Sequence, residues 1–275
     1  KVVAAWNGMA VAALAETGAL LDRPDLVDAA REVADLLARV HLEGGRLRRT
    51  SRDGRAARHE GVLEDYGDVA EGLLALHGVT GEFRWLEMAG GLLDTVLAHF
   101  TDPEGALYDT ADDATDSRLG GIRRPHDPTD NATPSGQSAA AGALLSYAAL
   151  TGSSVHREAA EQALALVPRV GTQYPQALGW ALAVAEALLA GPLEVAVVGP
   201  EGDPATRALH ATALRGTSPG TVVSVGEPDA AGVPLLADRP LVGDRPAAYV
   251  CRGFVCEAPV VEVDDLARLV GTRKD

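Results

Sequence analysis

The sequence is poor in aromatic residues and in cysteine. Phe, Trp and Tyr make up 4% of the 275 residues, and only two cysteines are present. Two cysteines are too few for a disulfide-scaffold protein, and their scarcity is typical of a reducing compartment. We therefore expect a cytoplasmic protein.

Positive charge is also scarce, since 24 Lys and Arg residues face 39 Asp and Glu residues, for a net charge of −15. Nucleic-acid binding relies on clustered Lys and Arg, so we expect neither a nucleic-acid partner nor an anionic membrane surface. No apolar run reaches the roughly 20 residues of a membrane-spanning helix. No signal-peptide pattern opens the chain. The chain starts at Lys1 inside an expected helix, so we expect the protein to extend further on its N-terminal side.

The sequence does contain a repeat of helical segments. Three stretches, starting near residues 13, 73 and 144, each hold an apolar helix, a Thr-Gly pair, a short turn and an amphipathic helix. The glycines of these pairs, Gly18, Gly81 and Gly152, suit helix C-terminal caps. Short turns make each pair of helices an antiparallel hairpin. With one further first helix, the expected helices span residues 2–18, 24–40, 64–80, 83–100, 134–151, 154–168 and 175–190.

The composition of these helices predicts an inner and an outer ring. The first helix of each hairpin is richer in Ala, Gly and apolar residues, whereas the second carries charged stripes. Such rings occur in α/α toroids and in α-solenoids. The links between hairpins differ greatly in length, and two carry strand-like pieces ("GGRLRRT" and "GALYDT"), which favours the toroid. The predicted fold is mainly α: a six-hairpin-type α/α toroid over residues 1–191, partial because N-terminal hairpins are missing.

The pattern changes after Gly191-Pro192 to strand, helix and strand, followed by a hairpin and a short helix. This order predicts a small α/β module over residues 192–275. Its segment "VAVVGPEG" lacks the spacing of a dinucleotide-binding fingerprint, and we expect no cofactor.

The two cysteines lie in the hairpin of this module. With Arg252-Gly253 at the tip, Cys251 and Cys256 would be diagonal neighbours on one sheet face, with Cβ atoms ~7–8 Å apart. That distance is long for a disulfide. Two interpretations stay open: buried, reduced cysteines that pack the sheet, or a candidate redox pair. A metal site would need a further His or Cys at ligand spacing, and the seven histidines are scattered, so we expect no metal.

Three polar stretches each lead into an expected inner helix, so they should gather at one end of the toroid. They are Trp6-Asn7-Gly8, Glu64-Asp65-Tyr66 and "RRPHDPTDN" (123–131), which precedes Thr133, the expected N-cap of the next helix. Carboxylates at such an end could serve as general acid and base in glycoside chemistry, and aromatic and amide groups could hold a sugar. The predicted catalytic residues are Asp65, Asp127 and Asp130. The predicted substrate-binding residues are Trp6, Asn7, Tyr66, Arg124 and Ser135.

Each of these residue types also has a structural interpretation. Asp127 and Asp130 could form Asx turns with the residues that follow them. Acidic residues such as Glu64 and Asp65 favour the first turn of a helix regardless of function. Trp6 could belong to the core, and Arg124 could be a surface charge.

Four segments, in order, resemble the spermatogenesis-associated protein 20 family: "KVVAAWNGMAVAALA", "LEDYGDVAEGLLAL", "DPTDNATPSGQSAAA" and "AYVCRGFVCEAP". The family's motif positions fall on the predicted site residues named above and on Cys251 and Cys256. Gln137 and His126 depart from the residues typical of the family. The resemblance implies the C-terminal part of a protein whose N-terminal thioredoxin-like domain is absent here.

The resemblance also implies a function. The family's toroid is similar to those of N-acylglucosamine 2-epimerases and six-hairpin glycosidases, which implies carbohydrate processing. The epimerases' paired histidines have no counterpart at the ends of the expected inner helices. We therefore expect a carbohydrate-active domain, glycosidase- or epimerase-like, with a small-molecule ligand such as a sugar. The alternative is a non-catalytic ligand-binding or scaffold module that serves the thioredoxin-like redox domain.

Overall fold

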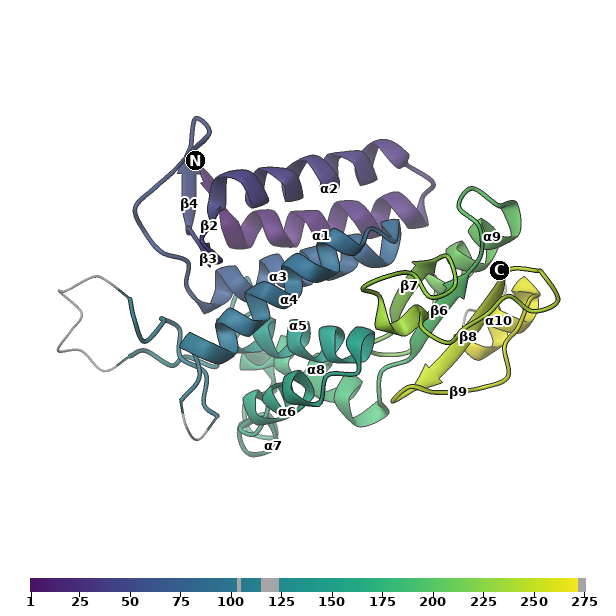
Figure 1. Ribbon diagram of the computed structural model, residues 1–275. Helices are drawn as coiled ribbons and strands as arrows, with labels where there is room; N and C mark the ends of the chain where they lie inside the picture. The colour runs from purple at the N-terminus through teal and green to yellow at the C-terminus, as the bar shows by residue number, and fades with distance from the viewer. Residues whose placement is uncertain (103–104, 115–123, 272–275) are drawn as a thin grey trace.

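Helical hairpins form most of the chain, as expected. The computed structural model describes residues 1–102, 105–114 and 124–271. Figure 1 shows the first hairpin, α1 and α2, beside α3 and α4, with α5, α6 and α8 following. The helices are α1 (Ala4–Leu20), α2 (Pro24–Leu36) with a π-helical end (Leu37–His41), α3 (Leu63–Thr80), α4 (Phe83–His99), α5 (Gly136–Thr151), α6 (Ser154–Ala163), the short α7 (Val167–Val170) and α8 (Gly179–Ala190).

The helix ends follow the capping signals in part. Gly81 and Gly152 are left-handed C-caps, with φ of 71° and 74°. Gly18 is not a cap, because α1 continues to Leu20. The predicted N-cap Thr133 is also wrong, because the hydroxyl of Ser135 accepts the N–H of Ser138 at 3.1 Å and starts α5 two residues later.

Helices α1, α3, α5 and α8 form the inner layer, each packed against the next. Glycines bring their backbones together. A Cβ atom added to Gly67 of α3 would lie 2.6 Å from the backbone nitrogen of Ala140 on α5. Likewise, Gly8 of α1 and Gly72 of α3 each face a backbone carbonyl of the other helix. The predicted inner ring is therefore present as four successive helices in direct contact.

The links between hairpins carry short strands. After α2 the chain forms β2 (Leu42–Glu43), β3 (Arg46–Leu47), β4 (Thr50–Arg52) and β5 (Arg55–Ala56), and β4 also pairs with β1 (Val2–Val3). The expected strand in "GALYDT" is reduced to one isolated bridge between Thr101 and Leu107. These links cover the end of the inner layer at which α1 and α3 begin.

The C-terminal module is a four-stranded sheet in the order β7-β6-β8-β9. Its elements are β6 (Glu194–Val198), α9 (Pro204–Ala213), β7 (Val222–Gly226), a 3-10 turn (Pro234–Leu236), β8 (Ala247–Arg252), β9 (Val255–Cys256) and α10 (Val263–Leu269). Strands β6 and β7 are parallel, as expected for a strand–helix–strand unit, and β8 and β9 run antiparallel to their neighbours.

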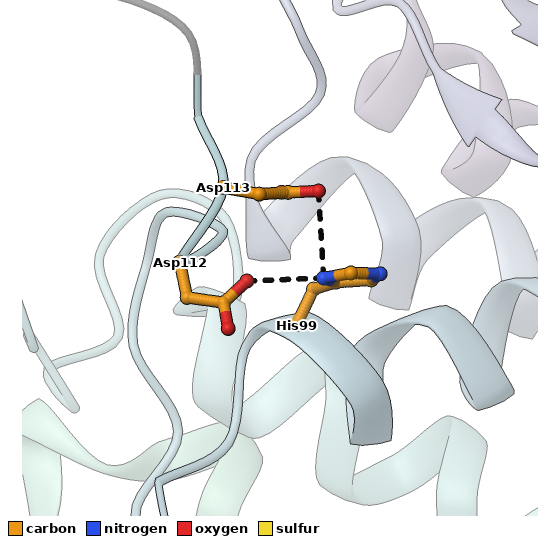
Figure 2. A group of neighbouring side chains, drawn as sticks. All are labelled: His99, Asp112 and Asp113. Atoms are coloured by element: carbon orange, nitrogen blue, oxygen red, sulfur yellow. Dashed lines mark hydrogen bonds and ion pairs between the residues drawn. The ribbon is translucent and has the colours of Figure 1, made fainter.

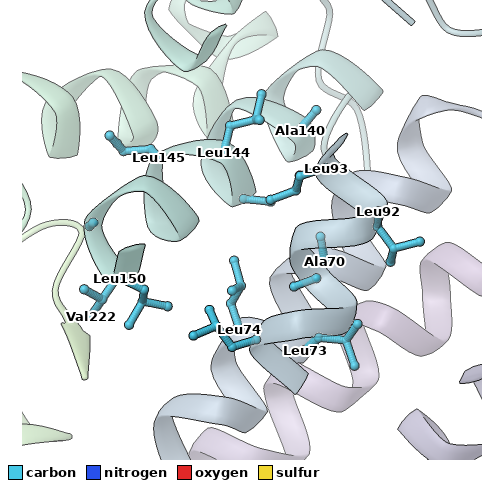
Figure 3. Close-up of a cluster of buried hydrophobic side chains, with 14 of the residues drawn as sticks. Ala70, Leu73, Leu74, Leu92, Leu93, Ala140, Leu144, Leu145, Leu150 and Val222 are labelled. Carbon is cyan, nitrogen blue, oxygen red and sulfur yellow. The ribbon is translucent and has the colours of Figure 1, made fainter. Parts of the chain in front are cut away.

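Both faces of this sheet are buried. In β6, Val195 and Val197 pack with α9 and α10, whereas Ala196 and Val198 join the core of the helical hairpins. Figure 3 shows the same continuity, since Val222 of β7 lies beside Leu150 of α5 and across from Leu74 of α3. One core thus runs from the hairpins into the module. No helix in the described part of the chain is long and apolar enough to cross a membrane.

Replacement of Gly67 by Ala should destabilise the fold. The added methyl group would collide with the backbone of α5, and overpacking of this kind costs about 1–3 kcal/mol. The matched control is Gly91→Ala in the outer helix α4, where an added Cβ has no neighbour within 4 Å. That change should stabilise the protein by about 0.5–1 kcal/mol, because Gly is a poorer helix former than Ala. Urea unfolding measures both, and equal midpoints for the two variants would contradict the packing described here.

Candidate functional site

The polar stretches meet at the end where the inner helices begin. The N–H of Ala5 on α1 donates to Asp65 on α3 at 3.1 Å. A Cβ on Gly136 of α5 would lie 2.9 Å from the nitrogen of Glu64. Asp130, in turn, accepts the N–H of Trp180 on α8 at 2.8 Å. The expected gathering at one end is therefore observed, and the contacts show what the residues do there.

Asp65 is fully buried and its carboxylate is fully engaged. One oxygen accepts from Ala5, and the other accepts the N–H of Val62 at 3.0 Å and a guanidinium N–H of Arg49 at 2.9 Å. Burial raises the pKa of Asp65, while the two backbone N–H groups and Arg49 act in the opposite direction. Asp65 thus connects α1, the start of α3 and the strand region, and its carboxylate is closed to solvent.

Tyr66 lies in the core. Its side chain is 1% exposed, its hydroxyl accepts the N–H of Leu47 at 2.9 Å, and its ring packs on Phe100 with centroids 5.0 Å apart. The predicted role of Tyr66 as a sugar platform is contradicted, because no face of the ring is open.

Asp127 and Asp130 make the turn and capping contacts of the structural interpretation. Asp127 is exposed and accepts from the N–H and hydroxyl of Thr129, which lower its pKa. Asp130 accepts the N–H groups of Ser135, Trp180 and Ala181 and so joins the starts of α5 and α8. Ser135 is buried and serves as the N-cap.

The remaining predicted residues are divided between structural contacts and open surface. Arg124 donates to the carbonyls of Thr110 and His99 and lies over the ring of Tyr108, at 4.4 Å from its centroid. The Asn7 amide donates to the carbonyl of Val3 at 2.8 Å. Trp6 is 63% exposed, so it is a surface aromatic and not part of the core. Arg123 lies outside the described residues.

Residues of all four inner helices line a cavity of about 480 Å³, and we call it the inner-helix pocket. Three carboxylic acids line it, Glu16 from α1 and both Asp68 and Glu71 from α3, together with the half-exposed indole of Trp180 on α8. The rest of its lining is small or apolar: Met9, Ala12, Ala13, Ala139, Gly142, Leu145, Ser146, Ala183, Val184, Ala187 and Gly220.

Asp68 is the most perturbed acid in this pocket. The residue is 3% exposed, and its Oδ2 has no hydrogen-bond partner among the described residues. Burial, followed by the negative charges of Glu64, Asp65 and Glu71, raises the pKa of Asp68 to about 8. A buried polar atom without a partner is rare in folded proteins and marks a place where a ligand group can bind.

Glu71 and Glu16 extend this acidic group along the pocket. Glu71 is exposed on the pocket side of α3, and desolvation by the pocket walls, followed by the charge of Glu16, raises its pKa to about 7. Desolvation also raises the pKa of Glu16. The pocket therefore offers carboxyl groups that exchange protons near neutral pH, which is what acid–base catalysis requires.

Sequence reasoning missed this pocket because it searched the helix starts. Asp68 and Glu71 are three residues apart, so they share one face of α3, and Glu16 interrupts the apolar surface of α1. Acidic residues on an otherwise small and apolar helix face are the sequence pattern that indicates such a pocket.

A second polar group lies outside the pocket, beside the outer helix α4. Figure 2 shows His99 between Asp112 and Asp113, with Nδ1 at 3.0 Å and 3.5 Å from their nearest oxygens. Both oxygens of Asp113 also accept from Arg46 at 2.8 Å, which lowers the pKa of this carboxyl. An arginine bound to both oxygens competes with a metal ion, so we interpret the group as an exposed ion-pair network.

The cysteines form a disulfide, Cys251–Cys256, with an S–S distance of 2.06 Å. The predicted diagonal register is wrong, because the two residues are direct partners across β8 and β9. The turn is Gly253-Phe254, both with positive φ (57° and 62°), and Glu194 holds it by accepting both N–H groups at 3.0 Å and 2.7 Å. The interpretation as buried, reduced thiols is therefore also wrong, and Cys256 is exposed.

The fold is that of an α/α toroid. The structure resembles cellobiose 2-epimerase from Bacillus thermoamylovorans with a TM-score of 0.50 and 11% sequence identity, over 60% of this chain and 43% of that one. Four inner helices, three of them paired with an outer helix, plus a small α/β module agree with the predicted fold class. No protein-family model matches the chain.

In sequence, the chain is similar to spermatogenesis-associated protein 20. It is 38% identical to the mouse protein over 161 residues and 29% identical to the human protein over 287 residues, which covers 98% of this chain. These matches confirm the predicted resemblance to the spermatogenesis-associated protein 20 family. They span 20% of the mouse and 36% of the human protein, so the chain corresponds to about a third or less of these relatives.

Replacement of Asp65 by Ala should destabilise the fold by about 2 kcal/mol or more. The N–H groups of Ala5 and Val62 would lose their acceptor, and each unpaired buried polar group costs about 1–3 kcal/mol. Asp127→Ala is the matched control, because its partners lie in one exposed turn, and it should change stability by no more than about 0.5 kcal/mol. Urea unfolding of both variants is the measurement. Equal losses of unfolding free energy in the two variants would show that Asp65 does not connect these elements.

The pKa of Asp68 predicts a pH-dependent stability. The folded state holds the Asp68 proton up to about pH 8, whereas the unfolded chain releases it near pH 4. The free energy of unfolding should therefore fall as pH rises through this window, by up to about 1.4 kcal/mol per pH unit from this group. In Asp68→Asn this contribution is absent, so the variant should gain stability over the wild type as pH rises from 4 to 8. Urea unfolding at several pH values from 4 to 8 measures this, with Asp127→Asn as the control. If the difference in unfolding free energy between the wild type and Asp68→Asn did not change with pH, Asp68 would not be a buried, protonated acid.

Proposed function

We propose that this chain is a carbohydrate-active domain that binds a neutral sugar in the inner-helix pocket, with Asp68 and Glu71 as its acid–base residues. The observation that carries the proposal is Asp68, a buried acid with an unpaired oxygen and a pKa of about 8, on the wall of a cavity formed by all four inner helices.

The pocket lining suits a sugar. Carboxyl groups accept hydrogen bonds from hydroxyls, and an indole such as that of Trp180 offers an apolar face with a polar edge. Carboxyl groups on one side and a half-exposed aromatic ring on another therefore match the mixed polar and apolar surface of a pyranose. Three carboxyl groups and a chain charge of −15 disfavour phosphorylated or acidic sugars.

The raised pKa values divide the chemical roles. At pH 7, Asp68 is mostly protonated and suited to act as the general acid, whereas Glu71 is partly ionised and suited to act as the base. A carboxyl pair of this kind serves glycoside hydrolysis, in which one group protonates the leaving oxygen and the other activates water. It also serves epimerisation, in which one group removes a carbon-bound proton and the other returns it. The fold shared with a cellobiose 2-epimerase supports sugar chemistry in general.

These assignments move the proposed chemistry away from the helix starts. Asp65, Asp127 and Asp130 position the loops and helices, and Trp6 remains a surface aromatic near the start of α1. The alternative proposal keeps a ligand in the pocket without turnover, in a module that serves a thioredoxin-like domain of the longer protein.

A panel of neutral sugars (glucose, mannose and cellobiose) tests the proposal by calorimetric titration and by product analysis after incubation. We expect one of them to bind to the wild type and to Asp127→Asn and to be converted by both. Asp68→Asn should still bind the sugar but lose about 100-fold or more in turnover, because general acid–base catalysis contributes about 10²–10⁴-fold. Glucose 6-phosphate should bind more weakly than glucose.

The outcomes separate the candidates. Binding without conversion by the wild type would favour the non-catalytic module. No binding of any neutral sugar would overturn the carbohydrate proposal. Equal turnover by Asp68→Asn and Asp127→Asn would overturn the role of Asp68.

A further inference from the structure

The disulfide of the C-terminal module lies against a buried positive charge. Arg239 is 7% exposed, and its Nη2 group points at both sulfur atoms, at 3.6 Å from Sγ of Cys251 and 3.3 Å from Sγ of Cys256. Its Nη1 group donates to the carbonyl of Ala237, and its Nε has no partner among the described residues.

A buried guanidinium normally has a carboxylate partner. Within the described chain, no carboxylate oxygen lies within ion-pair distance of Arg239. Desolvation lowers its pKa, while the charges of Glu194, Asp238 and the Tyr249 hydroxyl act in the opposite direction from farther away. Both Glu194 oxygens already accept N–H groups of the hairpin turn. The neutral disulfide therefore occupies the place where an anion would be most stabilised.

We propose that Cys251–Cys256 is a reversible disulfide that exchanges with external thiols, and that Arg239 stabilises its reduced form by pairing with the thiolate. This site is distinct from the inner-helix pocket, and the proposal does not depend on the sugar chemistry proposed above.

The geometry defines the direction of exchange. Cys256 is exposed and Cys251 is 1% exposed, so an external thiolate attacks the sulfur of Cys256. The S–S bond breaks, and Cys251 leaves as a thiolate beside Nη2 of Arg239. A second external thiol then attacks the external sulfur of the mixed disulfide, releases Cys256 as a thiolate that takes up a proton, and forms the external disulfide. Two thiols thus supply the two electrons that reduce the protein.

The hairpin is held in a way that keeps this exchange reversible. Glu194 accepts both N–H groups of the turn, and Arg252 donates to the carbonyls of Ala190 and Gly191 at the end of α8. Phe254 packs against Gly152 at the end of α5. None of these contacts involves a sulfur atom, so reduction leaves the two cysteines facing each other and ready to reoxidise.

The test is a redox titration of the full chain in dithiothreitol buffers, with the reduced fraction read by alkylation and mass spectrometry. Arg239→Met should lower the equilibrium constant for reduction at least tenfold, which corresponds to about 30 mV for a two-electron couple. Arg245→Met is the matched control. Arg245 lies in the same module, but its side chain pairs with the exposed Glu262 and with neither sulfur atom. This control should leave the constant unchanged.

A second measurement keeps the proposal testable if Arg239→Met does not fold, as judged by circular dichroism. In the reduced wild type, the rate of iodoacetamide alkylation against pH should give a thiol pKa below the ordinary value of about 8.5. Site-resolved mass spectrometry should assign this low value to Cys251, the thiolate that pairs with Arg239. A thiol pKa at or above 8.5 would overturn the proposal. So would equal reduction constants for wild type and a folded Arg239→Met, or a disulfide that is reduced only when the protein unfolds.

Discussion

The structure depends on backbone contact between the inner helices. Gly8 and Gly72 remove the side chains that would separate α1 from α3, and Gly67 does the same between α3 and α5. Because the backbones are in direct contact, no water fits between the helices, and each helix buries one face of its neighbour. The backbone of Asp68 lies directly against Gly8 of α1, and the residue is 3% exposed although it lines the pocket.

The hairpins and the inner layer could be predicted because their signals are local. Apolar periodicity, the caps Gly81 and Gly152, and the small residues of the first helices each act within a few positions of the chain. The exact start of α5 and the register of the cysteine hairpin could not be predicted. Ser135 competes with Thr133 for the same capping role, and the turn at Gly253-Phe254 depends on Glu194, which is 59 residues away from Gly253 in sequence.

The candidate site was harder to predict than the fold for a physical reason. A polar loop such as residues 123–131 attracts attention in a sequence, but polar side chains in loops have backbone N–H groups nearby, and Asp127 and Asp130 are used to bind them. An acid within a helix has no such local donors, because the helix consumes its own. Oδ2 of Asp68 is therefore left without a partner among the described residues, and only the packing of the other helices around this side chain reveals it.

The common direction of the inner helices has an electrostatic consequence. Parallel helices place the positive ends of their macrodipoles side by side, and four such ends repel one another unless negative charge lies between them. Asp65 and Asp130 provide this charge, since each binds N–H groups of two adjacent helices. Part of the acidity of this chain is thus the counter-charge of its own helices, and a toroid built this way favours acids at one end irrespective of what it binds.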